Sequence, residues 1–360
     1  MNRTVKIAGT GSYLPEGREG NRDLFARQSI QANFDVERAR EALREVPDAA
    51  HLTPEEVFDQ WARQVTGIEE RRILMGGDAF TTEHMCAEAG ARALAMAGMD
   101  LEDVDLVVLA SVTPSDSVPN AACTVGSLMG RTDLGGFSLN GACAGFLHAI
   151  GTAQGLVATG SANTILAISG DTLSRITSYA DPKTAVLFSD GAGAAVVTAA
   201  DENDNGRIEG APYFAADYAR EHLYLRGQGW EEEHEPNARL HMGGGPRVLR
   251  RAIMAMAGVS EVALDRAGLS WDDVDYVVPH QANLRITRGL EKHLELDGRV
   301  IHTIQRYGNA SASTVAVALD ELLRGRHGAL PDPARILLAA VGGGYTMGAL
   351  SLRWAGGPQG

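Results

Sequence analysis

The sequence predicts a duplicated, layered α/β fold made of two similar halves. Strand-like and helix-like runs alternate along most of the chain, which is the pattern of packed α/β layers. In addition, residues 93–108 recur as residues 263–278, and each copy indicates a helix that ends at glycine, an acidic turn and a buried strand. We therefore expect one half at residues 1–200 and the other at residues 201–360.

The first half opens with a strand, which is followed by an unusually charged stretch. We expect residues 17–60 to form a helical insertion. Near its end, Thr53-Pro54-Glu55-Glu56 has the N-cap, N1-proline and capping-box pattern of a helix start. This helix would carry Trp61 and end near Gly67. Trp61 is either a core residue or a platform for a flat ring, and the residues alone leave both interpretations open.

A tight strand-to-helix junction follows in the same half. A strand-like run at residues 136–139 leads to Cys143, which lies among small residues before an apolar helical run. A thiol in the first turn of a helix meets the positive end of the helix dipole and free N–H groups, which favour the reactive thiolate. The second half has a similar junction at residues 307–314. Cys143 is therefore a candidate nucleophile.

Composition and charge exclude several classes of function. The net charge of −14 disfavours nucleic acid as a partner, because phosphate binding needs a basic surface. There is no signal-peptide core and no apolar run of the roughly 18–20 residues that a membrane span needs, so we expect no membrane association and a cytoplasmic location. The other cysteines, Cys86 and Cys123, are expected in the core. No metal-binding motif is present, so no metal is expected.

Glycine-rich segments give no sign of a nucleotide cofactor. Gly9-Thr10-Gly11 lacks the third glycine of the dinucleotide motif, and Pro15 falls where its helix should run. Gly342-Gly343-Gly344 follows a strand and indicates a tight turn whose N–H groups could face an anion. Residues 201–245, polar and rich in glycine and acidic residues, predict turns, loops and short strands.

Two further polar residues suggest a catalytic set with Cys143. His280 follows a strand at residues 276–278, and Asn309 follows Gly308, so we expect both at strand ends, where α/β folds gather ligands. A thiolate can accept an acyl group from a thioester at little free-energy cost. Imidazole and carboxamide N–H groups could then stabilise the enolate that forms when a second thioester loses carbon dioxide.

The motifs around these residues resemble β-ketoacyl-acyl-carrier-protein synthase III, a family of the thiolase superfamily. The similarity is in register from about residue 60 to 353 and in the first strand, and it implies a thiolase-like α-β-α-β-α layered fold. The motifs are Ala142–Phe146, Pro279–Ile286, Gly308–Asn309 and Gly342–Thr346.

The resemblance implies the reaction and the catalytic roles. Cys143 would carry the acyl group, His280 and Asn309 would promote decarboxylation, and the backbone N–H groups of Cys143 and Gly343 would form the oxyanion hole. The substrates would be acyl-coenzyme A and malonyl-acyl-carrier protein, condensed by a ping-pong mechanism that initiates fatty acid synthesis. No cofactor would be needed beyond the coenzyme A thioester, and the enzyme would be a homodimer.

The resemblance also implies binding residues. Trp61 would stack on the adenine of coenzyme A, and Val118, Phe188 and Asn283 would contact the substrate. Arg285 would help to dock the acidic carrier protein. Together with Arg285, a group of arginines would form a basic patch: Arg247, Arg250, Arg251 and Arg288.

Several positions depart from the family pattern and leave the acyl donor open. Pro182 and Pro246 replace an arginine and an asparagine that contact coenzyme A, and Val118 replaces a phenylalanine typical of acetyl-specific enzymes. The alternatives are a specialised role in secondary metabolism, with a longer or unusual acyl donor, and the head-to-head condensation of two acyl-CoAs. Enzymes that join two acyl-CoAs head to head carry a glutamate near Val118, and residues 114–120 contain none.

Overall fold

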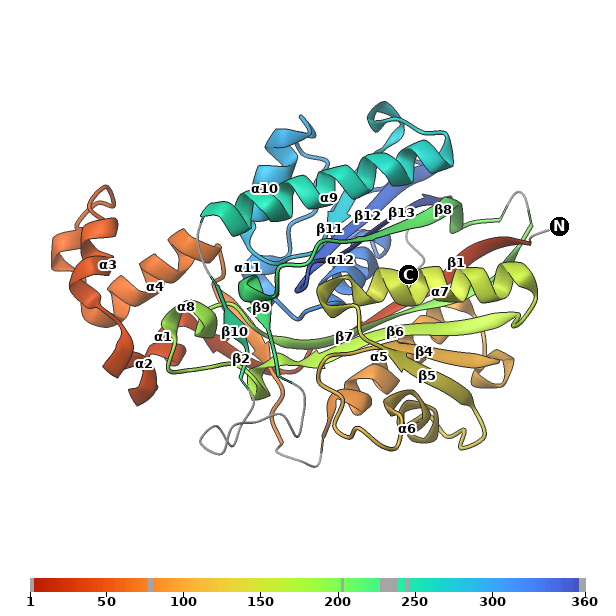
Figure 1. The fold of residues 1–360 in the computed structure, drawn as a ribbon, viewed down its shortest axis with the longest axis horizontal. Coiled ribbons are helices and arrows are strands. Elements are labelled where there is room, and N and C mark those ends of the chain that lie inside the picture. The colour runs from red at the N-terminus through yellow and green to blue at the C-terminus, as the bar shows by residue number, and fades with distance from the viewer. Residues whose placement is uncertain (1–2, 77–79, 202–203, 227–238, 244–245, 356–360) are drawn as a thin grey trace.

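A nine-stranded mixed sheet runs through the described part of the molecule, in the order β11-β12-β13-β8-β1-β7-β6-β4-β5 (Figure 1). The structure is a computed structural model that describes residues 3–76, 80–201, 204–226, 239–243 and 246–355. The strands are β1 (Thr4–Tyr13), β4 (Leu106–Ala110), β5 (Gly135–Leu139), β6 (Thr164–Thr172), β7 (Asp190–Ala200), β8 (Arg207–Ala216), β11 (Tyr276–Pro279), β12 (Ala334–Gly342) and β13 (Thr346–Trp354).

The two ends of this sheet repeat one pairing pattern. In the first half, β4 is parallel to β5 and β6, and β6, β7 and β1 then pair antiparallel. In the second half, β11 is parallel to β12, and β12, β13 and β8 pair antiparallel. The second half has no full strand equivalent to β5 among the described residues. At that position, beside β11, it has a single parallel bridge between Val277 and Val300. The expected duplication is confirmed, whereas the division into domains at residue 200 stays a prediction.

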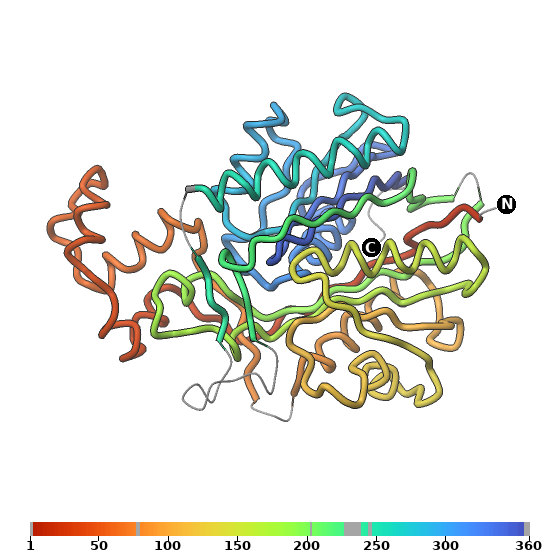
Figure 2. Tube along the Cα trace, in the orientation of Figure 1, coloured from red at the N-terminus to blue at the C-terminus, as the bar shows by residue number. Residues whose placement is uncertain are grey.

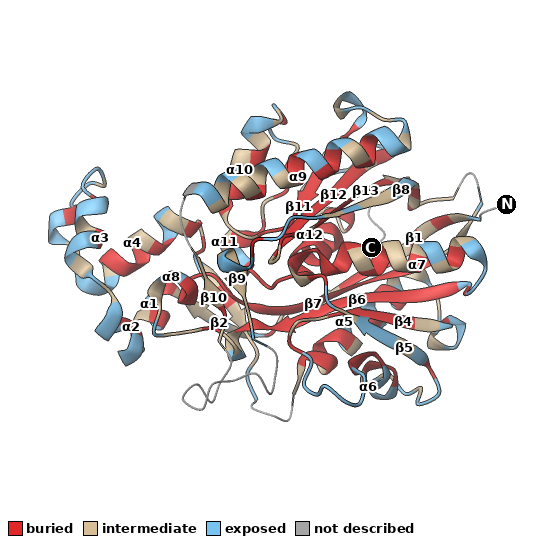
Figure 3. Ribbon diagram, viewed as in Figure 1, coloured by how far each residue is buried: buried red, intermediate tan, exposed pale blue. Residues whose placement is uncertain are grey.

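Helices cover both faces of these strands and fill the space between the halves. Figures 1 and 2 show α9 and α10 over the second-half strands, α5 and α6 over the first-half strands, and α7 and α12 between them. Every residue of α12 is buried, and Figure 3 shows this helix in red. These helices are α5 (Thr82–Ala97), α6 (Ala121–Leu128), α7 (Gly145–Thr159), α9 (Pro246–Ala267), α10 (Leu284–His293) and α12 (Ser313–Leu323).

The charged insertion forms a group of short helices at one end of the molecule (Figure 1). Its helices are α1 (Asn21–Phe25), α2 (Gln28–Asn33), α3 (Val36–Ala42) and α4 (Pro54–Thr66), beside the small sheet of β2 (Gly17–Gly20) and β3 (Glu70–Ile73). The predicted start and end of α4 are confirmed. Thr53 and Glu56 form the capping box, and Gly67 ends the helix with a φ of 78°.

Two expectations about local structure are wrong. The polar region after residue 201 contains β8, a ten-residue strand of the main sheet. Only Ile208 of this strand is buried, so its sequence lacks the apolar run that marks the other strands. Cys123 is exposed, because it lies outside the buried face of α6, which Ala121, Ala122, Val125 and Gly126 form.

The remaining elements of that region are short. They are β9 (Leu223–Tyr224) and β10 (His241–Met242), whereas the acidic run at residues 231–235 lies outside the described residues. Within the described ranges, no helix combines the length and apolar character needed to cross a membrane.

Close packing of α5 on β1 explains the first glycine-rich segment. A Cβ atom on Gly11 would lie 2.3 Å from the carbonyl oxygen of Ala89 and 2.4 Å from the nitrogen of Ala93, both backbone atoms of α5. Glycine at this position therefore allows the helix to approach the strand.

Gly11→Ala is expected to lower the free energy of unfolding by about 1–3 kcal/mol, because overpacking forces backbone shifts. Gly155→Ala on the exposed face of α7 is the control, since nothing lies within 4 Å of its added Cβ. This control should raise stability by up to about 1 kcal/mol. Urea unfolding measures both, and equal stability of the two variants would contradict the packing argument.

Candidate active site

Cys143 lies at the junction between β5 and α7. A short 3-10 turn, Ala142–Ala144, leads from the strand into the helix, and Ala142 has a φ of 46° in the left-handed region. The turn between β12 and β13 faces this junction closely, since a Cβ on Gly342 would lie 2.6 Å from the Cys143 nitrogen. The cysteine is therefore held between the two halves, with 8% of its surface exposed.

Burial dominates the acidity of Cys143. It raises the pKa of the thiol to about 12, whereas the Ser311 hydroxyl and the backbone N–H groups of Gly343 and Cys143 act in the opposite direction. The thiolate expected at this helix start is therefore not the resting form, and the group rests as a thiol. The two N–H groups that face the sulfur are the pair predicted for the oxyanion hole, and this role stays a prediction.

His280 is fixed at the end of β11, as its position after a strand predicted. Its backbone N–H donates to the Ala339 carbonyl, and its Nδ1 lies 2.7 Å from the Thr314 hydroxyl oxygen. Only 1% of the residue is exposed, and burial lowers the pKa of the imidazole to about 3. His280 is therefore a neutral imidazole with a fixed ring orientation at ordinary pH.

Asn309 follows a short helix, so the expectation that it ends a strand is wrong. Helix α11 (Ile304–Tyr307) ends at Gly308, and Asn309 then forms a parallel bridge with Phe188. Its side-chain Oδ1 accepts a hydrogen bond of 2.9 Å from the Ser311 backbone N–H. Because this bond uses the carbonyl of the amide, the NH₂ group is left for the cavity.

A buried carboxylate supports the segment that carries Asn309. Glu321 on α12 is 1% exposed and accepts hydrogen bonds from the Tyr307 hydroxyl and from the guanidinium groups of Arg306 and Arg326. Since Tyr307 lies two residues before Asn309, these bonds tie the end of α11 to the central helix. The carboxamide is thereby placed by the core.

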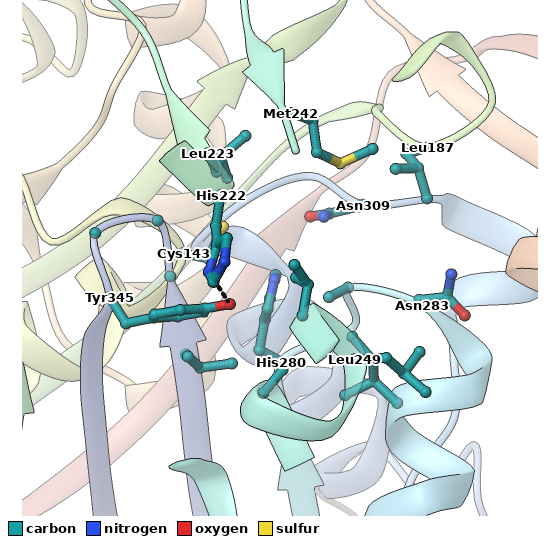
Figure 4. Close-up of a pocket in the computed structure, with 18 of the residues that line it drawn as sticks. Cys143, Leu187, His222, Leu223, Met242, Leu249, His280, Asn283, Asn309 and Tyr345 are labelled. Carbon is teal, nitrogen blue, oxygen red and sulfur yellow. Dashed lines mark hydrogen bonds between the residues drawn. The ribbon is translucent and has the colours of Figure 1, made fainter. Parts of the chain in front are cut away.

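The three predicted catalytic residues line one cavity of about 220 Å³. Figure 4 shows Cys143, His280 and Asn309 around the same space, walled by residues from α9 and α10 and by the turn after β12. A second cavity, of about 480 Å³, also reaches Cys143 and shares Phe188, Leu223, Gly343 and Gly344 with the first. Cys143 therefore lines two neighbouring cavities.

The predicted substrate residues have different surroundings. Phe188 lines both cavities, and Asn283 lines the smaller one. The Asn283 amide is already engaged, because it caps α10 through the Arg285 N–H and donates to the Val65 carbonyl. Val118 is 88% exposed and lines neither cavity of its own chain.

Trp61 packs in the core of the insertion. Its ring centroid lies 5.0 Å from that of Phe34 and 5.7 Å from that of Phe58. This packing favours the core interpretation, and the stacking role stays a prediction. The two prolines at coenzyme A positions, Pro182 and Pro246, each begin a helix, where proline is favoured.

The basic patch lies beside the smaller cavity. Arg247 and Arg285 are exposed next to the cavity residues Val248 and Asn283, and neither forms an ion pair with a described residue. Arg251 differs, because it pairs with Asp217 and lies over the Tyr345 ring. Arg250 and Arg288 are also exposed.

The cavity contains polar residues that the sequence did not single out. His222 Nδ1 lies 3.1 Å from the Tyr345 hydroxyl oxygen, the contact dashed in Figure 4. Ser311, which lines the larger cavity, has its hydroxyl oxygen 3.9 Å from the sulfur of Cys143, and the charge of the fully buried Asp171 raises the pKa of that thiol. Tyr345 and Ser311 fall in motifs already noted, whereas His222 and Asp171 have no local sequence signal.

Comparison with known proteins agrees with this geometry. Residues 264–354 match the family model described as 3-oxoacyl-[acyl-carrier-protein (ACP)] synthase III C terminal, and residues 137–212 match the model of 3-oxoacyl-[acyl-carrier-protein (ACP)] synthase III. The beta-ketoacyl-[acyl-carrier-protein] synthase III of Chlorobium luteolum is 33% identical over 354 residues, which cover 97% of this chain and 98% of the relative.

Solved structures show the same likeness. The 3-oxoacyl-(acyl carrier protein) synthase III of Pseudomonas aeruginosa PAO1 has a TM-score of 0.83 at 29% identity, covering 99% of this chain and 100% of that one. The priming beta-ketosynthase of the R1128 polyketide pathway also has a TM-score of 0.83 at 29% identity, covering 99% and 98%. Fold and likeness together define a thiolase-like condensing enzyme, which is an acyltransferase. The chain belongs to the β-ketoacyl-acyl-carrier-protein synthase III family.

The buried imidazole is expected to make the protein sensitive to acid. The pKa of His280 is about 3 in the folded protein, against about 6.5 for an ordinary histidine in the unfolded chain. Above pH 6.5 both states are neutral and the residue contributes nothing. As the pH falls from 6.5 to 3, only the unfolded state binds the proton, so stability falls by about 1.4 kcal/mol per pH unit.

Urea unfolding between pH 7 and pH 4 measures this slope. His280→Gln should flatten it relative to the wild type, whereas substitution of the exposed His293 by Gln should leave it unchanged. An identical slope in the wild type and the His280 variant would contradict the prediction.

Proposed function

We propose that the protein catalyses the decarboxylative condensation of an acyl thioester with malonyl-acyl-carrier protein. The products are a β-ketoacyl-carrier protein, carbon dioxide and the free thiol of the donor. The observation that carries this proposal is the convergence of Cys143, His280 and Asn309 on one cavity, with a second, larger cavity that also reaches Cys143. The reaction would initiate the synthesis of an acyl chain.

In the first half-reaction, the sulfur of Cys143 attacks the thioester carbonyl of the donor. The carbonyl oxygen becomes negative in the tetrahedral intermediate, and the N–H groups of Cys143 and Gly343 would stabilise that charge. The acyl group then extends into the larger cavity while the donor thiol leaves. Exchange of one thioester for another is nearly neutral in free energy, so the step is reversible.

In the second half-reaction, the malonyl group loses carbon dioxide and forms an enolate. His280 and the free NH₂ group of Asn309 would donate hydrogen bonds to the enolate oxygen. The Thr314 hydroxyl lies 2.7 Å from His280 Nδ1 and 3.0 Å from the Ser311 carbonyl, and it has one proton to donate. His280 donates through Nε2 in the arrangement in which this hydroxyl turns from the Ser311 carbonyl and donates to Nδ1. The enolate carbon then attacks the acyl group on Cys143 and releases the sulfur. No carboxylate base is required, because no proton leaves carbon.

The larger cavity supports an acyl group longer than acetyl. Its volume of about 480 Å³ lies in the range that holds drug-sized ligands. Leu173, Phe188 and Leu240 provide buried apolar walls. The likeness to the priming β-ketosynthase of a polyketide pathway favours a second candidate, a condensing enzyme of secondary metabolism with an unusual donor.

The surface supports two partners. Exposed Arg247 and Arg285 beside the smaller cavity would attract an acidic carrier protein. The edge strand β5 exposes Phe137, and the nearby Val118 is also exposed, so pairing of β5 with a second copy would form a homodimer and cover both. A cytoplasmic location fits the supply of coenzyme A thioesters and carrier protein.

Radiolabelled acyl-CoAs of increasing chain length test the reaction. The wild type should take up label and Cys143→Ala should not. Added malonyl-carrier protein should then release carbon dioxide. His280→Ala and Asn309→Ala should keep the label but release carbon dioxide about 10²–10³-fold more slowly, because each variant loses a donor to the enolate. Labelling without carbon dioxide release would refute condensation, and absence of label with every donor would refute acyl transfer.

Arg285→Glu is expected to raise the KM for malonyl-carrier protein about tenfold at low salt with little change in kcat, because charge reversal at a rim slows association. Activity with malonyl-CoA, which has no protein surface, should be unaffected. Arg38→Glu, at an exposed site on α3, is the matched control. An unchanged KM for the carrier protein in the Arg285 variant would show that this residue does not take part in docking.

A further inference from the structure

Cys143 has a buried neighbour that the reaction described above does not use. Among the described residues, Ser311 is the one whose side chain hydrogen-bonds to the sulfur, with its hydroxyl oxygen 3.9 Å from Sγ. Ser311 has a φ of 56°, a costly conformation for a residue other than glycine. Its N–H binds the Asn309 side chain, and its carbonyl accepts the Thr314 hydroxyl. Both neighbours therefore hold the strained residue, and its hydroxyl, in place.

Asp171, near the end of β6, lies next to Ser311 and is 0% exposed. Its Oδ1 accepts four hydrogen bonds of 2.8–3.1 Å from Ser111 Oγ, Val112 N, Thr113 N and Thr113 Oγ1. Its Oδ2 is buried and has no well-formed hydrogen bond to a described residue, although the Ser311 hydroxyl approaches the carboxyl. Such an unsatisfied buried oxygen is uncommon in folded proteins and suggests a functional reason.

Acyl transfer needs a group that takes the proton of Cys143. The thiol pKa of about 12 means that the proton is present when the substrate arrives. No hydrogen bond joins the His280 imidazole to the sulfur within the described structure, and burial lowers the pKa of this imidazole to about 3, so it is a poor proton acceptor. The thiol of Cys86 on α5 also feels the charge of Asp171. Burial raises the pKa of this thiol well above the ordinary value, so Cys86 keeps its own proton and does not compete for Asp171. Asp171, which Ser311 separates from the sulfur, is therefore the group that can accept the proton.

The environment of Asp171 suits this role. Burial raises the pKa of the carboxyl above its usual value, and the hydrogen bonds from Val112, Ser311, Thr113 and Ser111 act in the opposite direction. A raised pKa makes the carboxylate a better proton acceptor, while the four donors on Oδ1 fix its orientation. Oδ2 is thereby left for the Ser311 hydroxyl.

We propose that Ser311 and Asp171 form a proton relay for the acylation of Cys143, which rests on the acyl-transfer step proposed above. As the sulfur attacks the thioester carbonyl, its proton passes to Ser311 Oγ, and the Ser311 proton passes to Asp171 Oδ2. The carbon–sulfur bond of the donor breaks, and the leaving thiolate takes a proton from solvent. When the enolate later expels the Cys143 sulfur, both protons return along the same path. Ser311 touches the reacting atom and is a catalytic residue, whereas Asp171 acts through it as a positioning residue.

A purely electrostatic role of Asp171 predicts the opposite sign. The negative charge of this carboxylate raises the pKa of the Cys143 thiol, so its removal would ease ionisation and speed attack by the sulfur. The relay predicts slower attack, because the proton acceptor is lost. Asp171→Asn, which keeps the shape of the side chain, therefore separates the two roles by the direction of the rate change.

The test measures single-turnover acylation of Cys143 in the full chain by intact-protein mass spectrometry between pH 6 and pH 10. Ser311→Ala and Asp171→Asn should each acylate about 10²–10⁴-fold more slowly at pH 7. Their rates should keep rising with pH where the wild-type rate levels off. Ser313→Ala and Asp190→Asn are matched controls. Both residues are buried, and their side chains hydrogen-bond away from the sulfur, so their rates should stay near that of the wild type.

Alkylation of Cys143 by iodoacetamide over the same pH range is the second readout, because it needs no acyl substrate. The relay predicts slower alkylation near pH 7 in both variants. Wild-type or faster rates in Asp171→Asn, or a wild-type rate in Ser311→Ala, would overturn the relay. Should Asp171→Asn fail to fold, as judged by circular dichroism, Ser311→Ala alone decides. A wild type that is alkylated but never acylated would instead refute the proposed function.

Discussion

The active site depends on one constraint, which is that the two segments leading into α7 and α12 meet face to face between the halves of the fold. Helices α7 and α12 follow these segments and occupy the central layer, so Cys143 and Ser311 approach each other from opposite halves. Small residues make this approach possible. A Cβ on Gly145 would lie 2.9 Å from Ala110 Cβ, and one on Gly193 would lie 2.2 Å from Ala316 Cβ. Larger side chains would separate the layers and move the sulfur away from its partners.

Burial between the halves sets the electrostatics of the site. It raises the pKa of the Cys143 thiol and lowers that of the His280 imidazole, so both groups are neutral at rest. Charge develops only when substrate arrives, on an oxygen or on the sulfur. A low-dielectric site strengthens the hydrogen bonds that stabilise this charge, and groups already held in place need no reorganisation. Because the same burial keeps the proton on the Cys143 thiol, acyl transfer requires a nearby group that accepts this proton.

In the proposed reaction, the two cavities would divide substrate recognition into two tasks. The smaller one, with the exposed arginines beside it, suits the thiol carriers that enter and leave. The larger one, with buried apolar walls, suits the acyl group that stays on Cys143. Departures from the family pattern affect each task separately. Proline at positions 182 and 246 has no side-chain hydrogen-bonding group for a thiol carrier. The Trp61 ring packs against the rings of Phe34 and Phe58. Val118 is exposed and lines neither cavity, so in the proposed homodimer it would act on the acyl cavity of the second copy.

The sequence by itself determined the duplicated fold, the helix cap at Thr53 and the set of Cys143, His280 and Asn309. These features depend on local patterns, namely the internal repeat, capping residues and motifs, which can be read without knowing how distant segments pack. The strand β8 was not predicted, because too few of its residues are buried to leave an apolar pattern in the sequence. The exposure of Cys123 was not predicted, because the sequence did not show which face of its helix is buried.

Only the tertiary structure determines the protonation states of Cys143 and His280 and which side chains lie beside them. The thiol was expected to ionise because a helix start is visible in sequence, but the desolvation that opposes ionisation depends on how completely the two halves enclose it. Asp171 carries no local signal, since it is an ordinary residue of β6 until the fold brings Ser311 beside it from 140 positions away. Contacts between segments so far apart follow from the packing of the whole chain, which no short stretch of sequence encodes.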